Sequence, residues 1–217
     1  MATDFPLLDY AWRLLQGTGM TLAISCAAML ISLAGGLVLG VLMTLPNRLL
    51  RGICRAYLEF IRFMPVLVLL YIAYFGFAAW FGWHWQAYSV CILVFSLWGT
   101  AEMGDLVRGA LASIDCHQSE AALAVGLSKA QTYRYILLPQ SLRRALPGVV
   151  NLLTRMVKTT ALAALIGVVD VIKVAQQIIE LHPWSSLPVY GTVFFLYFLI
   201  CYPLSLLAAH LEHKETS

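Results

Sequence analysis

The chain has 217 residues, of which 61% are hydrophobic and 12% are charged, and its formal net charge is +3. Soluble domains carry about twice that share of charged residues, so the composition excludes an ordinary soluble domain and indicates an integral membrane protein. The length leaves room for about five spans and one substantial loop, but not for a second soluble domain. We therefore predict an all-α membrane protein that forms a single domain over residues 1–217.

Five apolar windows follow one another along the chain. Each is long enough to cross a hydrocarbon core of about 30 Å as a helix that rises about 1.5 Å per residue. The windows cover residues 20–45, 57–80, 87–107, 146–169 and 187–209. We predict that they form five transmembrane helices, with a long polar loop over residues 109–145.

The basic residues gather on one side of this predicted arrangement. Ten lie in or beside the first and third connections or at the C-terminus, whereas the opposite side has only Arg13 and Lys173. Because positive charge is enriched in cytoplasmic loops, we expect the N-terminus outside and the C-terminus and the long loop in the cytoplasm. The ten residues are Arg48, Arg51, Arg55, Arg62, Arg108, Lys129, Arg134, Arg143, Arg144 and Lys214.

Acidic residues stand near the end of the third window. Glu102 and Asp105 are three residues apart, so they lie on about one face of a helix, and Arg108 follows a turn later. Glu102 lies roughly 7 to 8 Å from the centre of its span. An acid at that depth is a functional candidate, and we expect Lys158 or Arg155 to be its partner. Asp105 and Arg108, nearer the interface, are predicted to form a structural ion pair.

The long loop is rich in helix formers. Residues 115–138 are predicted to form two short helices, with Gly126 capping the end of the first and Ser128 capping the start of the second. We expect Pro139 to end the second helix.

The first of these short helices offers small apolar side chains. Ala121, Ala122 and Val125 are expected to face a groove on a partner protein. The alternative is a helix that lies on the membrane surface, which the modest charge density supports less well.

Polar residues interrupt the fourth window. The apolar run breaks at residues 154–160 and resumes at 161–169, which places Arg155 and Lys158 at or near membrane depth. Each would cost roughly 2.5 to 3.5 kcal/mol at a lipid-exposed helix centre. They must therefore face a cavity or a partner, as in the broken helices of transporters. The alternative for Arg155 is that its side chain extends to the cytoplasmic surface.

The histidines and cysteines give no constellation typical of a metal site or an enzyme. His210 and His213 are three residues apart, but we expect them to be solvated in a frayed C-terminal tail. The five cysteines are scattered and odd in number. We predict no catalytic residue, no metal, no cofactor bound by this chain and no nucleic-acid partner.

The long loop resembles a known motif. Residues 120–122 (Glu-Ala-Ala), with Gly126 four residues later and Leu138-Pro139 further on, resemble the E-A-A loop of the membrane subunits of ABC importers. The longer stretch 118–151 is similar to the polar amino-acid uptake permeases.

Two further elements support this resemblance. Arg62, Pro65 and Leu67 stand where that family has an Arg-Gly-Thr-Pro-Leu signature, and residues 105–109 stand where it has a Glu-x-x-Arg-Gly element. The resemblance covers most of the chain, from about Gly17 to Leu211.

The resemblance implies the fold and the partners. It implies a type I ABC importer transmembrane domain in the bacterial cytoplasmic (inner) membrane, which pairs with a second permease subunit above a dimer of cytoplasmic ABC ATPases. An extracytoplasmic solute-binding protein would deliver the substrate, and membrane lipid would surround the subunit. The chain has no Gly-Lys pair and so no P-loop of its own, so ATP and Mg would be bound by the partner ATPase. The residues that would couple to that ATPase are Glu120, Ala121, Ala122, Gly126 and Pro139.

The chain departs from the family in two places. Phe63-Met64 replaces the small Gly-Thr pair of the signature. The family's Lys-Asp-Thr-Ser element, which is implicated in contacting the amino acid, reads Lys-Thr-Thr-Ala at residues 158–161, so the anionic partner for a substrate ammonium group is missing.

Two explanations of the missing carboxylate compete. Either this is the non-binding half of a heterodimer, which we favour slightly over a homodimer, or Glu102 supplies the carboxylate. The candidate substrate-pathway residues are Glu102, Lys158, Thr159 and Thr160. A rival reading of the whole chain is an ion- or proton-coupled secondary carrier that uses Glu102, Asp105 and Lys158.

Overall fold

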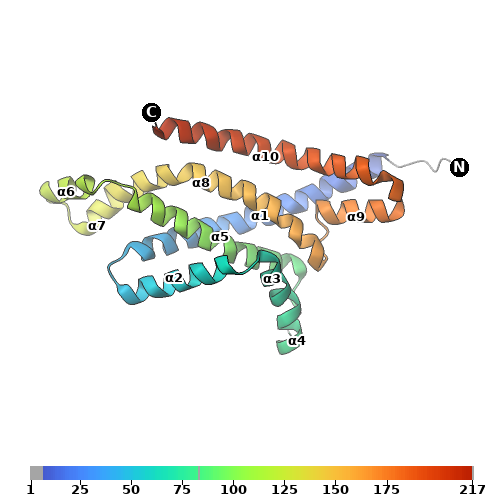
Figure 1. Ribbon diagram of the computed structural model, residues 1–217, viewed down its shortest axis with the longest axis horizontal. Coiled ribbons are helices and arrows are strands. Elements are labelled where there is room, and N and C mark those ends of the chain that lie inside the picture. Colours follow the sequence, from blue (N-terminus) through green and yellow to red (C-terminus); the bar gives the residue numbers. More distant parts are fainter. Residues whose placement is uncertain (1–6, 83, 217) are drawn as a thin grey trace. The chain divides into compact units, whose positions relative to one another are not determined.

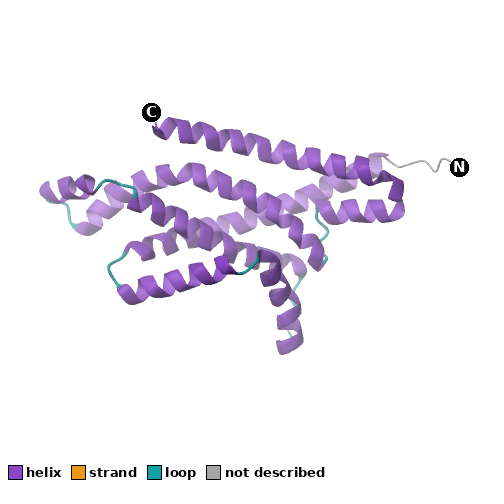
Figure 2. Ribbon diagram, viewed as in Figure 1, coloured by secondary structure: helices purple, strands orange, loops and turns teal. Residues whose placement is uncertain are grey.

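The computed structural model describes residues 7–82 and 84–216, and within these ranges all regular structure is helical (Figures 1 and 2). The prediction of an all-α protein is therefore confirmed. The α-helices are α1 (Leu7–Thr44), α2 (Arg48–Phe63), α3 (Val66–Tyr71), α4 (Phe77–Phe81), α5 (Ala87–Ala112), α6 (Cys116–Ala124), α7 (Lys129–Thr132), α8 (Leu138–Thr159), α9 (Val171–Leu181) and α10 (Ser186–Thr216). Two π-helical segments, η1 (Ile72–Gly76) and η2 (Tyr133–Leu137), and two 3₁₀ segments, η3 (Thr160–Ile166) and η4 (Pro183–Ser185), complete the described elements.

Several helices are longer than the apolar windows that predict them. Helix α1 begins at Leu7 rather than near residue 20, and α10 continues to Thr216 rather than ending near residue 209. Hydropathy marks the part of a helix that fits the membrane core, whereas the hydrogen-bond ladder continues into the polar flanks. The expected frayed tail is therefore wrong, since His210 and His213 lie within α10.

The second predicted span is not one helix. Helix α2 ends at Phe63, Met64 has an extended backbone with φ −84° and ψ 131°, and α3 begins after Pro65. Proline has no N–H to donate and disfavours helical backbone at the residue before it, so the break falls where these rules place it. Among the described residues four helices are long and apolar enough to span, or five when α2 and the α3–α4 segment count as one broken span.

The fourth span changes its helix type near the predicted interruption. Helix α8 continues through Thr159, and the 3₁₀ segment η3 follows until Gly167 ends it with φ +88°. The predicted break is therefore present, but it begins at Thr160 and not at residue 154. The hydroxyl of Thr160 donates to the carbonyl oxygen of Val157 at 2.7 Å, a local bond that competes with regular α-helical pairing.

Contacts divide the described chain into two compact units. Unit 1 comprises residues up to 29, 65–95 and 153–203, and unit 2 comprises 30–64, 96–152 and 204 onwards. Helices α1, α5, α8 and α10 each contribute residues to both units. The prediction of a single domain stays a prediction.

In unit 2, glycines allow the backbones of α1 and α5 to approach closely. A Cβ atom added at Gly40 would lie 2.5 Å from the Cβ of Val107 and 2.8 Å from the carbonyl oxygen of Gly104. On the other helix, a Cβ added at Gly104 would lie 2.7 Å from Cδ2 of Leu39. Gly36 is four residues before Gly40, which gives the small-xxx-small spacing that packs helices closely in membranes. We call this contact the α1–α5 seam.

In unit 1, helix α9 packs against α1 and α10. Its buried residues Val174 and Ile178 contact Leu14 of α1 and Val189 and Val193 of α10. This apolar cluster gives unit 1 its own core, separate from the seam of unit 2.

The start of α9 is fixed by polar contacts and by a close approach to α1. The buried carboxylate of Asp170 caps the helix by accepting from the backbone N–H of Lys173 at 2.9 Å. A Cβ added at Gly17 of α1 would lie 2.9 Å from the backbone of Val171.

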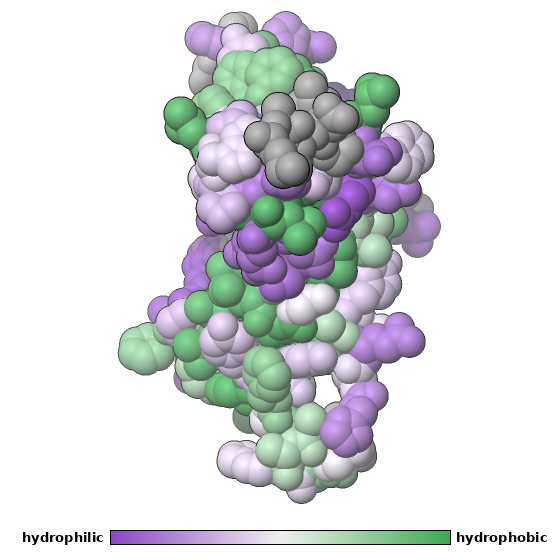
Figure 3. All heavy atoms as spheres, turned by 90° about the vertical axis from the view of Figure 1, so that its right-hand side faces the viewer, coloured by the Kyte–Doolittle hydropathy of each residue, from purple (hydrophilic) through white to green (hydrophobic). Residues whose placement is uncertain are grey.

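The α3–α4 segment exposes large apolar side chains, as a membrane-facing element does. Trp80 is 84% exposed and Phe75 is 53% exposed. Green and white side chains predominate in the lower part of Figure 3, where this segment lies.

Candidate coupling hairpin and polar network

Helix α6 begins at a side-chain cap. The carboxylate of Asp115 accepts from the backbone N–H of His117 at 3.0 Å, which satisfies one of the donors left open at a helix start. Asp115, Cys116 and His117 bring their possible metal-ligand atoms within 4.8 Å of one another, and all three are exposed. Because Asp115 already serves as the cap, we assign these residues to the helix start. The predicted absence of a metal site stays a prediction.

Gly126 forms the joint at which α6 ends. The N–H of Leu127 donates to the carbonyl oxygen of Ala122 at 3.1 Å, and the N–H of Gly126 donates to that of Leu123 at 3.0 Å, which is the Schellman pattern. Gly126 has φ +88°, and a Cβ added there would meet nothing within 4 Å. Glycine is needed here for the left-handed backbone and not for space. The predicted helix end at Gly126 is confirmed.

Ser128 starts the second helix with a capping box. Its hydroxyl accepts from the backbone N–H of Gln131 at 3.3 Å, and the side chain of Gln131 accepts from the backbone N–H of Ser128 at 2.8 Å. The predicted N-cap is therefore confirmed. We call residues 115–137 the coupling hairpin.

The expectation that Pro139 ends the second helix is wrong. Helix α7 continues through the π-helical segment η2 directly into α8 (Figure 1). Pro139 is the second residue of α8. Proline cannot donate a backbone hydrogen bond, and a π turn just before it shifts the bonding pattern so that the helical path continues.

The hairpin has an apolar and acidic outer surface. The side chain of Glu120 is 69% exposed, and one of its oxygens lies 3.2 Å from Nδ1 of His117. Val125 is 79% exposed and Leu123 is 44% exposed. Ala122 is only 3% exposed, so its predicted display to a partner is wrong, because α6 folds back against α7 and η2 and covers it.

Side-chain hydrogen bonds connect the hairpin to the helices of unit 2. Nε2 of Gln140 on α8 donates to Oε1 of Gln118 on α6 at 3.4 Å. The hydroxyls of Tyr133 on η2 and Thr44 at the end of α1 are 2.9 Å apart. The hairpin is therefore anchored on α1 and on α8.

The end of α5 is held to α8 as well. One guanidinium nitrogen of Arg144 donates to the carbonyl oxygen of Ser113 at 2.6 Å and to its hydroxyl at 3.1 Å. Because Ser113 directly follows α5 and precedes the hairpin, this contact completes the link between the hairpin and the spans.

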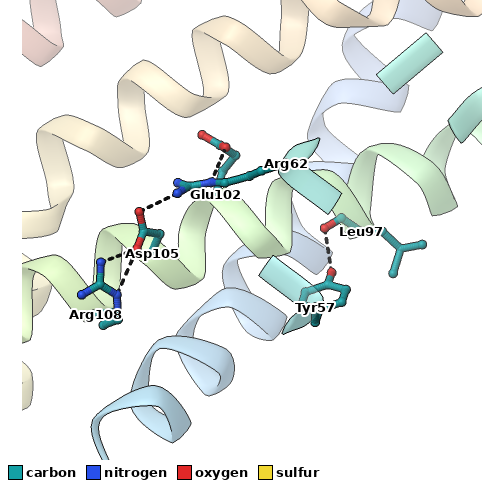
Figure 4. A network of polar contacts seen from close by, with 6 residues as sticks. All are labelled: Tyr57, Arg62, Leu97, Glu102, Asp105 and Arg108. Atoms are coloured by element: carbon teal, nitrogen blue, oxygen red, sulfur yellow. Dashed lines mark hydrogen bonds and ion pairs between the residues drawn. The ribbon is translucent and has the colours of Figure 1, made fainter. Parts of the chain in front are cut away.

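Four charged side chains of α2 and α5 form one network (Figure 4). Nε of Arg62 lies 3.1 Å from Oε1 of Glu102, and Nη1 of Arg62 lies 2.9 Å from Oδ2 of Asp105. Nη2 of Arg108 lies 2.6 Å from Oδ1 of Asp105, which is the ion pair that the sequence predicts. Arg62 as the partner of Glu102 was not predicted, because the two residues are forty positions apart and no local spacing connects them. We call these residues the polar network.

A pocket of about 720 Å³ borders this network in unit 2. Helix α8 lines the other wall with Gln140, Arg143 and Arg144. The pocket therefore contains both acidic and basic side chains and is suited to polar groups or water rather than to apolar chains.

The family of the chain follows from comparison with known proteins. A family described as "Binding-protein-dependent transport system inner membrane component" matches residues 36–216. The chain belongs to this family. It is therefore a membrane-spanning component of a binding-protein-dependent transport system, and it lies in the inner membrane.

The relatives are permease subunits. The chain is 36% identical over 191 residues to the probable amino-acid ABC transporter permease protein YckA of Bacillus subtilis (strain 168), covering 86% of this chain and 82% of YckA. It is 32% identical over 206 residues to the glutamine transport system permease protein GlnP of Escherichia coli (strain K12), covering 93% of this chain and 92% of GlnP.

Solved structures show the same fold. A chain from an amino acid ABC transporter crystallised with histidines matches with a TM-score of 0.88 and 26% identity, and the match covers 99% of this chain and 100% of that one. A chain of the MetNI methionine ABC transporter in an inward-facing conformation matches with a TM-score of 0.77 and 21% identity, covering 98% and 99%. The predicted type I ABC importer fold is confirmed, and membership of this permease family favours the importer over an ion- or proton-coupled carrier.

The candidate substrate segment of the permease lies in unit 1. Lys158 is exposed, whereas Thr160 is fully buried with its hydroxyl bonded to the backbone. The hydroxyl of Thr159 likewise donates to the carbonyl oxygen of Arg155 at 2.8 Å. Glu102 belongs to unit 2, and its pairing with Lys158 or Arg155 stays a prediction.

Proposed function

We propose that this chain is a permease subunit of an ATP-driven importer of amino acids and forms half of the translocation pathway. The named relatives that it resembles over most of its length support this substrate class. One observation supports a coupling role. The hairpin of residues 115–137 exposes Glu120 and Val125 and is also hydrogen-bonded to α1 and α8.

The hairpin would act as a rigid lever between an ATPase and the membrane spans. Its outer surface docks on a cytoplasmic ABC ATPase dimer, which binds ATP and Mg. Closure of that dimer moves the hairpin, and the Gln118–Gln140 and Thr44–Tyr133 contacts transmit the movement to α8 and α1. In this proposal the hairpin and the C-terminus are cytoplasmic and the N-terminus is outside.

We place the chain in a heterodimer with a sister permease that binds the amino acid delivered by an extracytoplasmic binding protein. Thr159 and Thr160 use their hydroxyls within their own helix, and residues 158–161 contain no carboxylate. The alternative acid, Glu102, already has Arg62 as a salt-bridge partner, which makes it a weaker ligand for a substrate ammonium group.

The coupling role is tested at Gly126. Gly126→Val should lower transport and ATPase stimulation at least tenfold, because a β-branched side chain disfavours φ +88° and would re-aim the hairpin. Gly126→Asn is the matched control, since asparagine tolerates the left-handed backbone, and it should retain most activity. Equal activity of the two variants would contradict the proposed lever.

The docking surface is tested by charge reversal. Glu120→Lys should release the ATPase during co-purification, whereas Glu180→Lys on α9, which is also exposed, should retain it. Retention of the ATPase at wild-type levels by Glu120→Lys would remove Glu120 from the interface.

A further inference from the structure

Helix α2 exposes two stripes of opposite chemistry, a basic one next to its buried face and an apolar one on the side away from it. Cys54 and Leu58 on the buried face pack against Met43 of α1. One exposed stripe is basic and contains Arg51 and Arg55, four residues apart and so a turn apart on one face. The other is apolar and consists of Leu49, Ile53, Phe60 and Phe63, which are between 58% and 91% exposed. We call these the arginine stripe and the apolar stripe of α2.

The arginine stripe opens into a pocket of about 460 Å³ within unit 2. The pocket lies among the end of α1, α2 and the end of α5. Its charged lining consists of the arginines Arg51, Arg55, Arg62 and Arg108 and the acids Glu59 and Asp105.

The charges of this pocket do not cancel. Asp105 contacts both Arg62 and Arg108 within 2.9 Å, so one carboxylate serves two guanidinium groups. Glu59 lies 3.9 Å from Arg55, at the limit of an ion pair, and both side chains are mostly exposed. Arg51 donates to the uncharged carbonyl oxygen of Leu45 at 2.8 Å. The lining therefore has four positive and two negative side chains, and Glu102, which pairs with Arg62 from outside the lining, leaves an excess of one positive charge.

We propose that this pocket binds the phosphate group of an anionic phospholipid, whose acyl chains lie along the apolar stripe of α2. Arginine presents several N–H donors in a planar fork that matches phosphate oxygens. Basic pockets between membrane helices on the cytoplasmic side are suited to such head groups. An amphipathic helix with arginines beside large apolar side chains is also the pattern of an element that lies at the membrane interface.

The apolar stripe commits the site to a lipid rather than to a soluble anion. A free phosphate would use only the arginines, whereas the acyl chains of a phospholipid also contact the apolar stripe, which includes Phe60 and Phe63. The inference uses the proposed cytoplasmic side of α2 but needs neither amino-acid transport nor the ATPase contact, so lipid binding can be tested independently of both.

The test measures phosphatidylglycerol binding to the purified permease–ATPase complex in detergent by native mass spectrometry. The R51Q/R55Q variant should bind phosphatidylglycerol about 25-fold more weakly, about fivefold for each arginine removed. The matched control is R48Q/K214Q, which also removes two exposed positive charges but leaves the pocket lining intact. The control should bind within twofold of the unchanged complex, and phosphatidylcholine should bind all variants alike.

Three outcomes would overturn the proposal. The first is equal weakening by both double variants, which would indicate only a diffuse surface charge. The second is competition by soluble glycerol phosphate as strong as that by the lipid, which would indicate a free-anion site. The third is loss of a permease subunit from R51Q/R55Q on size exclusion, which would assign α2 to a protein interface. Should R51Q/R55Q fail to insert or fold as a subunit, R51Q and R55Q separately decide, each with the expected fivefold effect against R48Q.

Discussion

The coupling hairpin and the α1–α5 seam both depend on glycine, but for opposite reasons. At Gly126 the space around the missing side chain is empty and the backbone is left-handed. At Gly40 the backbone is ordinary helix and the space is filled by Val107 and Gly104. The hairpin is therefore specified by local backbone chemistry, whereas the seam is specified by contacts between residues far apart in the sequence.

The largest effect on stability is expected at the α1–α5 seam. Gly40→Leu should lower the free energy of unfolding by about 3 kcal/mol, because the new side chain meets backbone and a buried valine that cannot move aside cheaply. Gly52→Leu is the control, since a Cβ there meets nothing within 4 Å. Thermal unfolding of the purified protein in detergent measures both, and equal shifts would mean that the seam is not close-packed.

A smaller loss of stability is expected when the polar network is broken. Arg62→Gln leaves Glu102 and Asp105, whose side chains are 14% and 24% exposed, without one of their guanidinium partners. Since Arg62 is itself 36% exposed, we expect a loss of about 1 to 2 kcal/mol, below the range for fully buried pairs. Arg55→Gln, whose ion pair with Glu59 is exposed, should change stability by less than about 0.5 kcal/mol in detergent without anionic lipid. If Arg62→Gln also lowers the free energy of unfolding by less than about 0.5 kcal/mol, the polar network adds no stability.

Within the hairpin the expected effect is local. Ser128→Ala removes the capping box and should destabilise α7 by about 1 kcal/mol, seen as faster hydrogen exchange over residues 129–137. Ser128→Thr keeps a capping hydroxyl and should exchange nearly as the unchanged protein does. Faster exchange that extends to the α1–α5 seam would mean that the stability of the hairpin is not local but is coupled to that of the seam.

Glu102→Gln should leave the apparent affinity for substrate nearly unchanged if the sister permease binds the amino acid. We expect a change below about twofold in the substrate concentration for half-maximal ATPase stimulation, with the ATPase and binding protein present. A tenfold loss of affinity without loss of assembly would instead make Glu102 the substrate ligand.

The smallest effect is expected at Pro139. Pro139→Ala restores a backbone N–H and should let the π turn of η2 become regular helix, with a change in stability below about 0.5 kcal/mol. Hydrogen exchange of residue 139 and its neighbours checks this. Loss of the helical path from α7 to α8 would mean that the proline is needed to direct it.

These contrasts also explain which parts could be predicted from the sequence. The joint of the hairpin was predictable because Gly126 and Ser128 signal a helix end and a helix start within three residues. The role of Pro139 was misjudged, because a π turn can absorb a proline that would otherwise end a helix. The break before Pro65 was hidden by an apolar window that averages over it.

Long-range features left no local signal. Arg62 and Glu102 are forty residues apart, and their contact depends on how α2 and α5 pack in unit 2. The burial of Ala122 likewise depends on the turn that folds α6 against α7 and η2, and not on the helix that contains it. Apolar periodicity identifies a helix, but it does not say which neighbour covers each face.

The coupling hairpin caps its own helices, so it should keep its fold as a separate peptide. The cap at Asp115, the turn at Gly126 and the capping box of Ser128 and Gln131 all use hydrogen bonds within residues 115–131. None of these bonds involves a membrane span. A synthetic peptide of residues 115–137, stapled across α6, should therefore mimic the proposed docking surface outside the membrane. Such a peptide would compete for the ATPase and offers a route to inhibitors that never enter the transport pathway.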